Sequence, residues 1–345
     1  MPYKATLEAL YEAFRNNGIL CKWNEPLSAH TSFRIGGNAA LSVWPSGRAQ
    51  LILVLSLWRD VGDGCPLCVL GNGSNVLVSD EGFCGLVVIT TKARRVVYEE
   101  DEVPDRDSFR REQTYCRVYA ECGASMTALA YNTGAPEREL SGLEFAYGIP
   151  GTVGGAIVMN AGAYGSDVER VLVSAEYYDL TTGQTVHLRD DEMELDYRHS
   201  IFLEHPAWIV LSGVFKLSYG FGEAIREKME ANMAARRDKQ PLEYPSAGSV
   251  FKRPVDNFAA KMIDTAGLKG VSVGGAQVSE KHAGFIVNRG GATASDVKKL
   301  VRLVRDEVEK IYHYRLECEI RLISDRPSEA DDWNSDGPDD PDLTE

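Results

Sequence analysis

The strongest constraint on the fold lies in the segment SGLEFAYGIPGTVGGAIVMNAGAYG, residues 141–165. Within eighteen residues it carries six glycines, interleaved with alanine, proline, isoleucine and valine: Gly148, Gly151, Gly154, Gly155, Gly162 and Gly165. A flexible linker would carry serine and glutamine where this segment has Ile149, Val153 and Ile157. Because glycine lets a backbone approach another surface closely, the segment predicts backbone packed against a flat, phosphorylated ligand. A buried helix with glycine contacts is the alternative.

Two further glycine-rich loops point the same way. The stretch VLGNGSNVLVSD places Gly71, Asn72, Gly73, Ser74 and Asn75 between two expected strands. Its glycines expose backbone N–H groups to an anion, and its serine and asparagines add donors. It is not the dinucleotide fingerprint, because Val76 replaces the third glycine and no long helix follows, so a plain hairpin turn stays open. With RIGG, residues 34–37, the three loops fit a cofactor that has an adenine, a pyrophosphate and a planar ring.

Composition narrows the class of protein. The 345 residues suggest two or three domains, and the net charge of −14 argues against a nucleic-acid-binding surface. No apolar run is long enough for a membrane span, and the N-terminal stretch resembles a helix rather than a signal peptide, so we expect a cytoplasmic protein. Seven scattered cysteines do not form a disulfide framework. We interpret Cys65 and Cys68, a C-x-x-C pair without a second ligand pair, as structural thiols, and we expect no metal site.

The pattern of elements changes along the chain. Residues 51–62 predict a helix, and residues 85–215 carry runs typical of strands, with 99–113 as an exposed hairpin loop. Helices are expected again at 221–240 and around NFAAKMIDTAG, and a final amphipathic helix is expected from an N-cap at Ser295. From Ser324 onward the chain has nine acidic residues and one arginine, which predicts a disordered tail.

Three stretches hold candidate reactive side chains. PSAGSVFKRP places Ser249 on what reads as a tight turn, DYRHSIF holds Tyr197 and Arg198, and LECEIRLI alternates apolar residues with Glu317 and Glu319. An exposed arginine and a solvated sheet face are the plain alternatives for the last two stretches. A Ser-His-Asp hydrolase has little support, because no G-x-S-x-G elbow is present and the histidines show no triad order.

Taken together, these segments resemble the UDP-N-acetylenolpyruvoylglucosamine reductases, also called UDP-N-acetylmuramate dehydrogenases. The resemblance runs from about residue 24 to 324, in the family's order, and is carried by HTSFRIGGNA, LGNGSNVLVSD, the 141–165 segment, YRHSIF, RRDKQPLEYPSAGSVFKRP, AGLKGVSVGGAQVSEKHAGFIVN and LECEIRLI. The short connection between YRHSIF and RRDKQP is similar to the second type, which lacks a tyrosine-bearing loop insertion. The acidic tail and the 99–113 loop are outside the shared pattern.

The resemblance implies an α+β fold. Two lobes of the vanillyl-alcohol-oxidase, PCMH-type class would hold non-covalent FAD, and a C-terminal α/β domain would hold the substrate. We expect lobes at 1–90 and 91–222, the substrate domain at 223–324 and the tail at 325–345. The implied flavin contacts are Arg34, Gly71, Asn72, Gly73, Ser74, Asn75, Gly148, Ile149, Gly151, Gly154, Gly155, Ala163 and Tyr164.

The implied reaction uses NADPH to reduce the enolpyruvyl ether of a UDP-amino sugar, a step of peptidoglycan precursor synthesis. Hydride leaves flavin N5, Ser249 donates a proton as general acid, and Arg198 and Glu319 stabilise the carbanionic intermediate, with Glu319 protonated or hydrogen-bonded. Tyr197, Lys239 and Lys252 would contact the sugar nucleotide, and we expect a monomer. Two alternatives stay open: a flavin oxidase that attaches FAD covalently, with His30 near the relevant loop, and a non-catalytic binding protein of the same fold.

Overall fold

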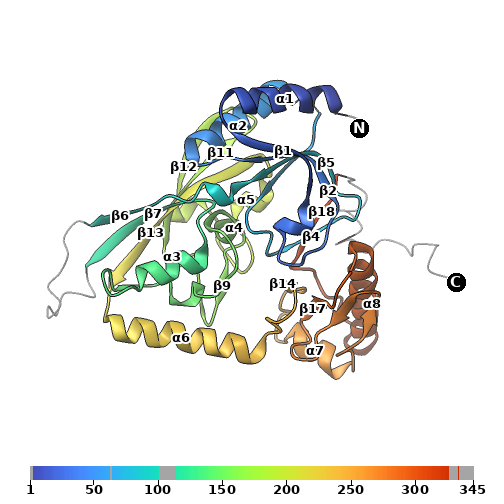
Figure 1. Ribbon diagram of the computed structural model, residues 1–345. Helices are drawn as coiled ribbons and strands as arrows, with labels where there is room; N and C mark the ends of the chain where they lie inside the picture. The colour runs from blue at the N-terminus through green and yellow to red at the C-terminus, as the bar shows by residue number, and fades with distance from the viewer. Residues whose placement is uncertain (1–2, 63, 101–113, 326–332, 334–345) are drawn as a thin grey trace. The chain divides into compact units, whose positions relative to one another are not determined.

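The computed structural model describes residues 3–62, 64–100, 114–325 and 333 (Figure 1). The chain divides into two compact units. Unit 1 comprises residues 1–24, 40–72 and 85–239, and unit 2 comprises residues 25–39, 73–84 and 240–345. Both units are therefore assembled from segments that are distant in the sequence.

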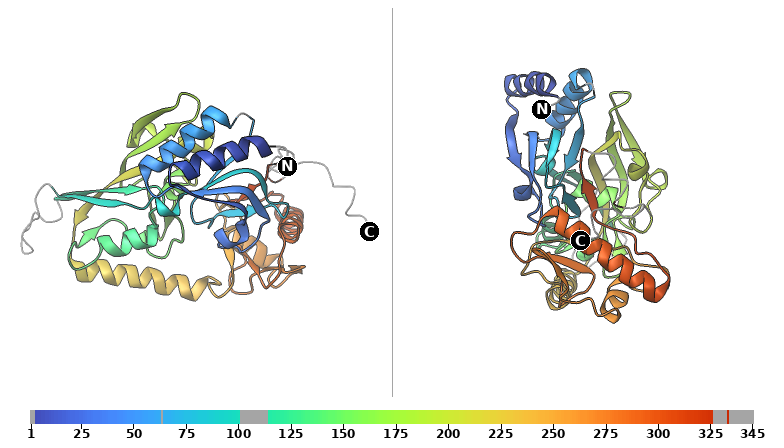
Figure 2. Two further views of the ribbon diagram at one scale, coloured as in Figure 1. Left: turned by 45° about the horizontal axis from the view of Figure 1, so that its top comes forward. Right: turned by 90° about the vertical axis from the view of Figure 1, so that its right-hand side faces the viewer.

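The first layer of unit 1 is a four-stranded sheet with two helices. Its strand order is β1-β2-β5-β3, formed by Leu20–Pro26, Asn38–Trp44, Phe83–Ile89 and Leu67–Leu70. Helices α1 (Lys4–Asn16) and α2 (Arg48–Val61) lie side by side in both views of Figure 2. They bury Leu7, Leu10, Phe14, Leu51 and Leu55 in one core with residues of the sheet. The helices expected at the N-terminus and at 51–62 are thus confirmed, although α2 begins three residues earlier.

The second layer of unit 1 is a larger antiparallel sheet. Its order is β12-β11-β13-β7-β6, formed by Gln184–Arg189, Leu172–Asp179, Trp208–Tyr219, Tyr115–Glu121 and Val96–Glu100, and β8 (Leu140–Ser141) pairs with β13. Strands β6 and β7 pair antiparallel with Glu99 opposite Arg117, as expected for a hairpin. Glu99 and Glu100, expected in its loop, belong to β6, and the rest of that loop, residues 101–113, lies outside the described residues. Strand β7 sends Cys116, Val118 and Ala120 into a core, and the alternate residues face away from it.

Short elements and helices pack on this second sheet. They are α3 (Met126–Thr133), η4 (Glu144–Ala146), α4 (Val153–Val158), β9 (Gly162–Ala163), β10 (Ser166–Asp167), η5 (Asp190–Glu192), α5 (Ile201–Glu204) and α6 (Gly222–Lys239); η2 (Thr90–Lys92) follows β5. Both α3 and α6 pack against η4, and α4 packs against β13. The core they close contains Leu129, Phe145, Ile157 and Phe215, all nearly inaccessible to solvent.

Unit 2 combines a four-stranded sheet, a two-stranded sheet and two helices. The larger sheet has the order β14-β17-β16-β15, formed by Ser246–Ser249, Phe285–Asn288, Ala276–Val278 and Ser272–Val273. Strands β18 (Arg321–Ile323) and β4 (Val76–Val78) pair in parallel, and η1 (Leu27–His30) precedes them in the chain. Helices α7 (Ala259–Thr265) and α8 (Ala294–Tyr312) close the core, and α8 buries Val297, Leu300, Val301, Val304 and Val308 as its periodicity predicts.

Three expectations about unit 2 need correction. The N-cap of α8 is Thr293, not Ser295, because the Thr293 hydroxyl accepts from the Asp296 N–H and the Asp296 carboxylate accepts from the Thr293 N–H in a capping box. Ser249 ends strand β14 and is not on an isolated turn: Gly248, with φ +82°, produces a bulge while the strand pairs with β17. In the expected disordered tail, Trp333 is 6% exposed and packs in the core of unit 2. Residues 326–332 and 334–345 lie outside the described residues.

Within the described ranges, no helix has both the length and the hydropathy needed to cross a lipid bilayer.

Candidate active site

The loop at 71–75 connects β3 to β4 and makes close backbone contacts at both of its ends. A Cβ on Gly71 would lie 2.3 Å from Thr152 Oγ1, and Asn72 Nδ2 donates to the Pro150 carbonyl at 2.7 Å. The first half of the loop therefore lies against the glycine-rich 148–165 segment within unit 1. The structure thus brings together two of the three glycine-rich loops that the sequence singled out.

Gly73 is the position in this loop where only glycine fits. Its φ of +58° lies in the left-handed region, and a Cβ there would be 2.3 Å from the His30 carbonyl oxygen. The Ser32 N–H donates to the Gly73 carbonyl at 3.0 Å and holds the two backbones together. The second half of the loop is thus fixed against residues 30–32 of unit 2, next to Arg34, which also has a positive φ (+56°) and is exposed.

In the glycine-rich segment the buried helix with glycine contacts is observed, and contact with a ligand stays a prediction. Gly154 lies in the short buried helix α4, where a Cβ would be 2.8 Å from Cys122 Cβ, so this glycine serves helix packing. Gly155, its neighbour, is exposed, and Gly148 has φ +93°. Ile149 packs at the margin of the core of unit 1. The segment therefore contains glycines of two kinds: Gly154 serves helix packing, and Gly155 leaves its backbone exposed.

An arginine that the sequence analysis did not select lies against this segment. Arg236, in α6, is only 9% exposed, and a Cβ on Gly148 would lie 3.1 Å from its Nε. Its Cζ is 5.7 Å from the ring centroid of Tyr164, which has a left-handed backbone (φ +54°) and is half exposed. Burial lowers the pKa of the Arg236 guanidinium, and Tyr164 opposes that shift. A largely desolvated cation thus lies against the 148–165 segment of an acidic protein.

Tyr197 and Arg198 lie at the tip of a small hairpin. The N–H groups of Asp196 and His199 each donate to the other residue's carbonyl, which places Arg198 in a left-handed conformation at φ +54°. The Arg198 guanidinium donates to the Gly162 carbonyl at 3.4 Å and lies 5.1 Å from the Tyr197 ring centroid. The hairpin therefore holds Arg198 beside Gly162, near the end of the 148–165 segment.

Ser249 and Glu319 come together in unit 2. The Glu319 N–H donates to the carbonyl of Val250, the residue after Ser249, at 2.7 Å. Asn75 Nδ2 donates to the Glu319 carbonyl at 3.1 Å. Ser249 and Glu319, 70 positions apart in sequence, are thus adjacent in space, and the end of the 71–75 loop lies beside them.

The two predicted substrate lysines differ in environment. Lys239 is the last residue of α6 and is exposed. Lys252 Nζ lies 3.2 Å from the Glu317 carboxylate, and both side chains reach solvent. Such an exposed pair is weak, so Lys252 is available to a stronger anion.

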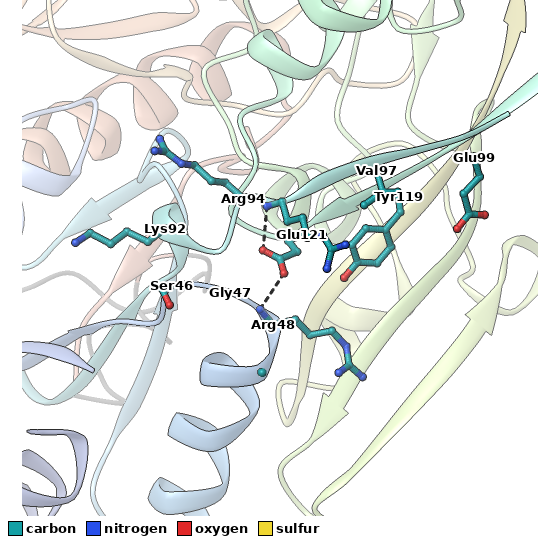
Figure 3. Close-up of a pocket in the computed structure, with 11 residues that line it drawn as sticks. Ser46, Gly47, Arg48, Lys92, Arg94, Val97, Glu99, Tyr119 and Glu121 are labelled. Atoms are coloured by element: carbon teal, nitrogen blue, oxygen red, sulfur yellow. Dashed lines mark hydrogen bonds between the residues drawn. The ribbon is translucent and has the colours of Figure 1, made fainter. Parts of the chain in front are cut away.

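A separate pocket of about 810 Å³ lies at the start of α2 in unit 1 (Figure 3). Its lining includes Arg48, Lys92, Arg95, Tyr119 and Glu121, and none of the predicted site residues. The Glu121 carboxylate accepts from the backbone N–H groups of Arg48 and Arg95, both at 3.0 Å. This carboxylate thus caps α2, and the pocket is distinct from the glycine loops.

The surroundings of Cys65 and Cys68 favour a structural role over a redox role. All seven are thiols, and Cys65 is buried while Cys68 is partly buried. Burial raises the pKa of the Cys65 thiol, which opposes the thiolate that redox chemistry needs. Glu194, His199 and Glu204 place one potential metal-ligand atom each within 4.8 Å of the others, although His199 already pairs with Glu204 at 3.4 Å.

Comparison with known proteins identifies the family. Residues 39–189 match the FAD binding domain family, and residues 240–323 match the C-terminal domain of UDP-N-acetylenolpyruvoylglucosamine reductase. A UDP-N-acetylenolpyruvoylglucosamine reductase from Caldanaerobacter subterraneus subsp. tengcongensis is 43% identical over 88% of this chain and 93% of its own. The chain belongs to the UDP-N-acetylenolpyruvoylglucosamine reductase family.

Two further reductases support the same family assignment. The reductase from Latilactobacillus sakei subsp. sakei is 43% identical, over 92% of this chain and 97% of its own. The crystal structure of the Thermus caldophilus reductase superimposes with a TM-score of 0.69 at 30% identity, covering 89% of this chain and 99% of that one. The expected α+β class with an FAD-binding part and a C-terminal part is confirmed.

The residues of the reductase site are compatible with FAD. The family uses a cofactor with a diphosphate, and the structure supplies close backbone at Gly71 and Gly73 and a buried cation at Arg236. Thr152 and Arg236 were missed by the sequence analysis. A signal for Arg236 existed, because it lies in the RRDKQP stretch that carried the resemblance. Thr152 gave no signal, since its role depends on contact with Gly71.

Proposed function

We propose that this protein reduces the enolpyruvyl ether of a UDP-N-acetylglucosamine derivative to the lactyl ether of UDP-N-acetylmuramate, with NADPH as reductant. The observation that carries the proposal is the adjacency of Ser249 and Glu319, joined through the Glu319 N–H and the Val250 carbonyl, in a chain of this family. When bound, FAD supplies the hydride chemistry between NADPH and the vinyl carbon of the substrate.

The protein's own residues have four tasks in this proposal. Gly71, Gly73 and Arg236, with the 148–165 segment, hold the cofactor through backbone donors and charge. Ser249 Oγ–H gives its proton to the substrate carbon next to the carboxylate, because a carbon base of this kind is strong enough to deprotonate a hydroxyl. Arg198 and Glu319 stabilise the negative charge that develops before that proton arrives.

Recognition of the sugar nucleotide is assigned to Tyr197, Lys239 and Lys252. Lys252→Ala should raise KM for the UDP-sugar while leaving NADPH oxidation at saturation nearly unchanged. Glu317→Gln is the matched control: it breaks the 3.2 Å pair with Lys252 but keeps the lysine, so KM should not rise. A KM that rises equally in both variants would assign the effect to the lost ion pair.

The decisive test separates the two half-reactions at Ser249. Ser249→Ala should keep flavin and its reduction by NADPH, and it should lose about 10²–10⁴-fold in reoxidation by the enolpyruvyl sugar. Ser249→Cys should recover part of that rate, and Glu319→Gln should be milder than Glu319→Ala. If Ser249→Ala slows both half-reactions equally, or neither, the serine has only a structural role.

A flavin oxidase with covalent FAD is the alternative in the same fold. His30 Nε2 lies 2.8 Å from the Glu25 carboxylate, so this ring nitrogen is engaged by an acid. We infer non-covalent binding: acid precipitation should release the flavin into the supernatant. We also propose a monomer acting in the cytoplasm, to be tested by light scattering and cell fractionation.

A further inference from the structure

Trp333 lies in an acidic stretch of sequence, yet it is among the buried residues of unit 2. It is 6% exposed and shares a core with Val304, Val308, Leu316 and Ile320. A tryptophan buries more apolar area than most side chains and places a single N–H donor at a defined point. Its position therefore fixes whatever backbone group accepts that donor.

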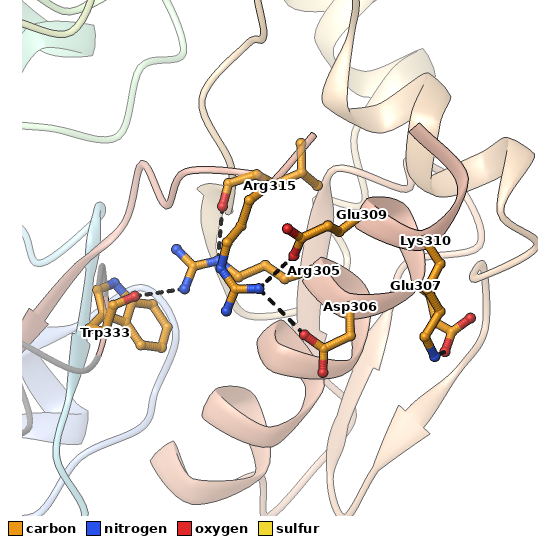
Figure 4. Close-up of polar contacts among 8 residues, drawn as sticks. Arg305, Asp306, Glu307, Glu309, Lys310, Arg315 and Trp333 are labelled. Atoms are coloured by element: carbon orange, nitrogen blue, oxygen red, sulfur yellow. Dashed lines mark hydrogen bonds and ion pairs between the residues drawn. The ribbon is translucent and has the colours of Figure 1, made fainter. Parts of the chain in front are cut away.

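The acceptor is the carbonyl of Ile320, the residue that follows Glu319 and precedes β18. The indole Nε1 of Trp333 donates to the Ile320 carbonyl at 3.0 Å. The buried guanidinium of Arg305 donates through Nη1 to the Trp333 carbonyl (Figure 4) and through Nε to the Leu316 carbonyl, both at 2.9 Å. Trp333 and Arg305 thus form one bonded unit along residues 316–320.

Among the described residues, Trp333 and Arg305 take the place that a neighbouring strand would occupy beside residues 316–320. On one edge of residues 316–320, the Glu317 carbonyl accepts from the Lys252 N–H and the Glu319 carbonyl accepts from Asn75 Nδ2. Because carbonyls alternate in direction along an extended chain, Leu316 and Ile320 present theirs to the opposite edge. Trp333 and Arg305 satisfy that edge with side chains, so the segment is held from both sides.

We propose that Trp333 is a positioning residue for the reaction: it holds the backbone on the C-terminal side of Glu319 and so sets where the Glu319 carboxylate lies relative to Ser249. The proposal rests on the proposed function, in which Glu319 acts on the substrate. It adds a requirement for a residue beyond the last strand, in the part of the chain that composition alone assigns to a disordered tail.

The experiment uses the full-length holoenzyme. Trp333→Ala should leave flavin reduction by NADPH unchanged and slow reoxidation by the enolpyruvyl sugar by about 10- to 100-fold, since a small misplacement of a reacting group has effects of that size. Trp333→Phe keeps most of the packing but removes the N–H donor, so it should lie between Trp333→Ala and the parent. A chain that ends after residue 335 keeps Trp333 and should match the parent.

Two further measurements distinguish positioning from general damage. Hydrogen exchange should rise in the peptide covering 316–323 in Trp333→Ala, and it should stay unchanged in α6 and β13. In a Glu319→Ala background, Trp333→Ala should add no further loss of reoxidation rate. Should Glu319→Ala slow the reaction while both Trp333 variants keep the parent rate, or should the Trp333→Ala loss persist in full without Glu319, the inference is wrong. If Glu319→Ala itself has no effect, the proposed function fails instead.

Discussion

A methyl group added at Gly73 tests whether the 71–75 loop holds the cofactor through its backbone. Gly73→Ala places a Cβ 2.3 Å from the His30 carbonyl oxygen and 2.8 Å from Thr31 Cα, so backbone must move. The hydrogen bond from the Ser32 N–H to the Gly73 carbonyl ties the same two segments together and resists that movement. Overpacking of this kind costs about 1–3 kcal/mol and the strained hydrogen bond about 1 kcal/mol.

Gly18 is the matched control. Its φ is +66°, close to the +58° of Gly73, and no heavy atom lies within 4 Å of where its Cβ would be. Alanine at Gly18 therefore carries only the left-handed backbone cost of about 1–2 kcal/mol. Gly73→Ala carries that cost as well as the clash, which brings it to about 3–6 kcal/mol.

The assay is apparent Tm by circular dichroism together with flavin content per chain. At roughly 2 °C per kcal/mol for a chain of this size, Gly73→Ala should lower Tm by about 6–12 °C and Gly18→Ala by about 2–4 °C. Gly73→Ala should also purify with little flavin, and Gly73→Asp with less, because its carboxylate would face the diphosphate. Equal Tm losses in the two alanine variants, each with full flavin, would refute the close approach at Gly73.

Three further outcomes follow from burial and charge. Burial raises the pKa of the Cys122 thiol to about 12 and that of the Cys318 thiol to about 11. At pH 8 a thiol reagent should therefore react with at most five of the seven cysteines of the native protein. Labelling of all seven before unfolding would contradict this. Burial lowers the pKa of His282, so the unfolded chain takes up its proton first, and stability should fall as pH drops below about 6.5 and level off below the folded pKa. Parallel curves of Tm against pH for the parent and His282→Asn would exclude that contribution. Arg48→Ala should destabilise by about 2–3 kcal/mol in urea, because Glu176, which is 5% exposed and bonded to Arg48 Nε at 2.6 Å, loses its guanidinium partner and keeps only the longer contacts with Ser212 and His187. Arg48→Met with Glu176→Leu should be milder, and an equal loss in both would point to packing.

Local chemistry explains the parts of this protein that could be predicted. A positive φ or a close backbone approach requires glycine, so Gly73 and Gly148 marked candidate cofactor loops before any contact was known. Helix α8 was predictable because its apolar residues recur at helical spacing, and the hairpin around 99–113 because two β-branched runs flank a charged stretch. Each of these signals lies within a few residues of the feature that it predicts.

The two errors have different physical origins. Thr293 and Ser295 are both good N-caps, and the structure uses Thr293 through its local capping box with Asp296. The carboxylate of Asp80, far away in sequence, supports the same helix start because it accepts from the N–H groups of Ala294 and Ser295. Ser249 was assigned to a turn because its strand partner, Phe285, is 36 positions away, so a long-range contact selected the strand there.

The proposed active site shows most clearly what the sequence determines and what only the tertiary structure determines. The residue types and order in the chain were enough to select Arg198, Ser249 and Glu319, since the motifs that contain them are contiguous stretches. The side chains that surround these three residues could not be predicted from contiguous motifs. Arg236 becomes a buried cation only because α6 packs against the 144–148 region, and Trp333 becomes a core residue only because Ile320 and Arg305 offer it hydrogen bonds. Composition describes the average solvation of a segment, whereas burial of one side chain depends on the partners that the folded chain brings to it.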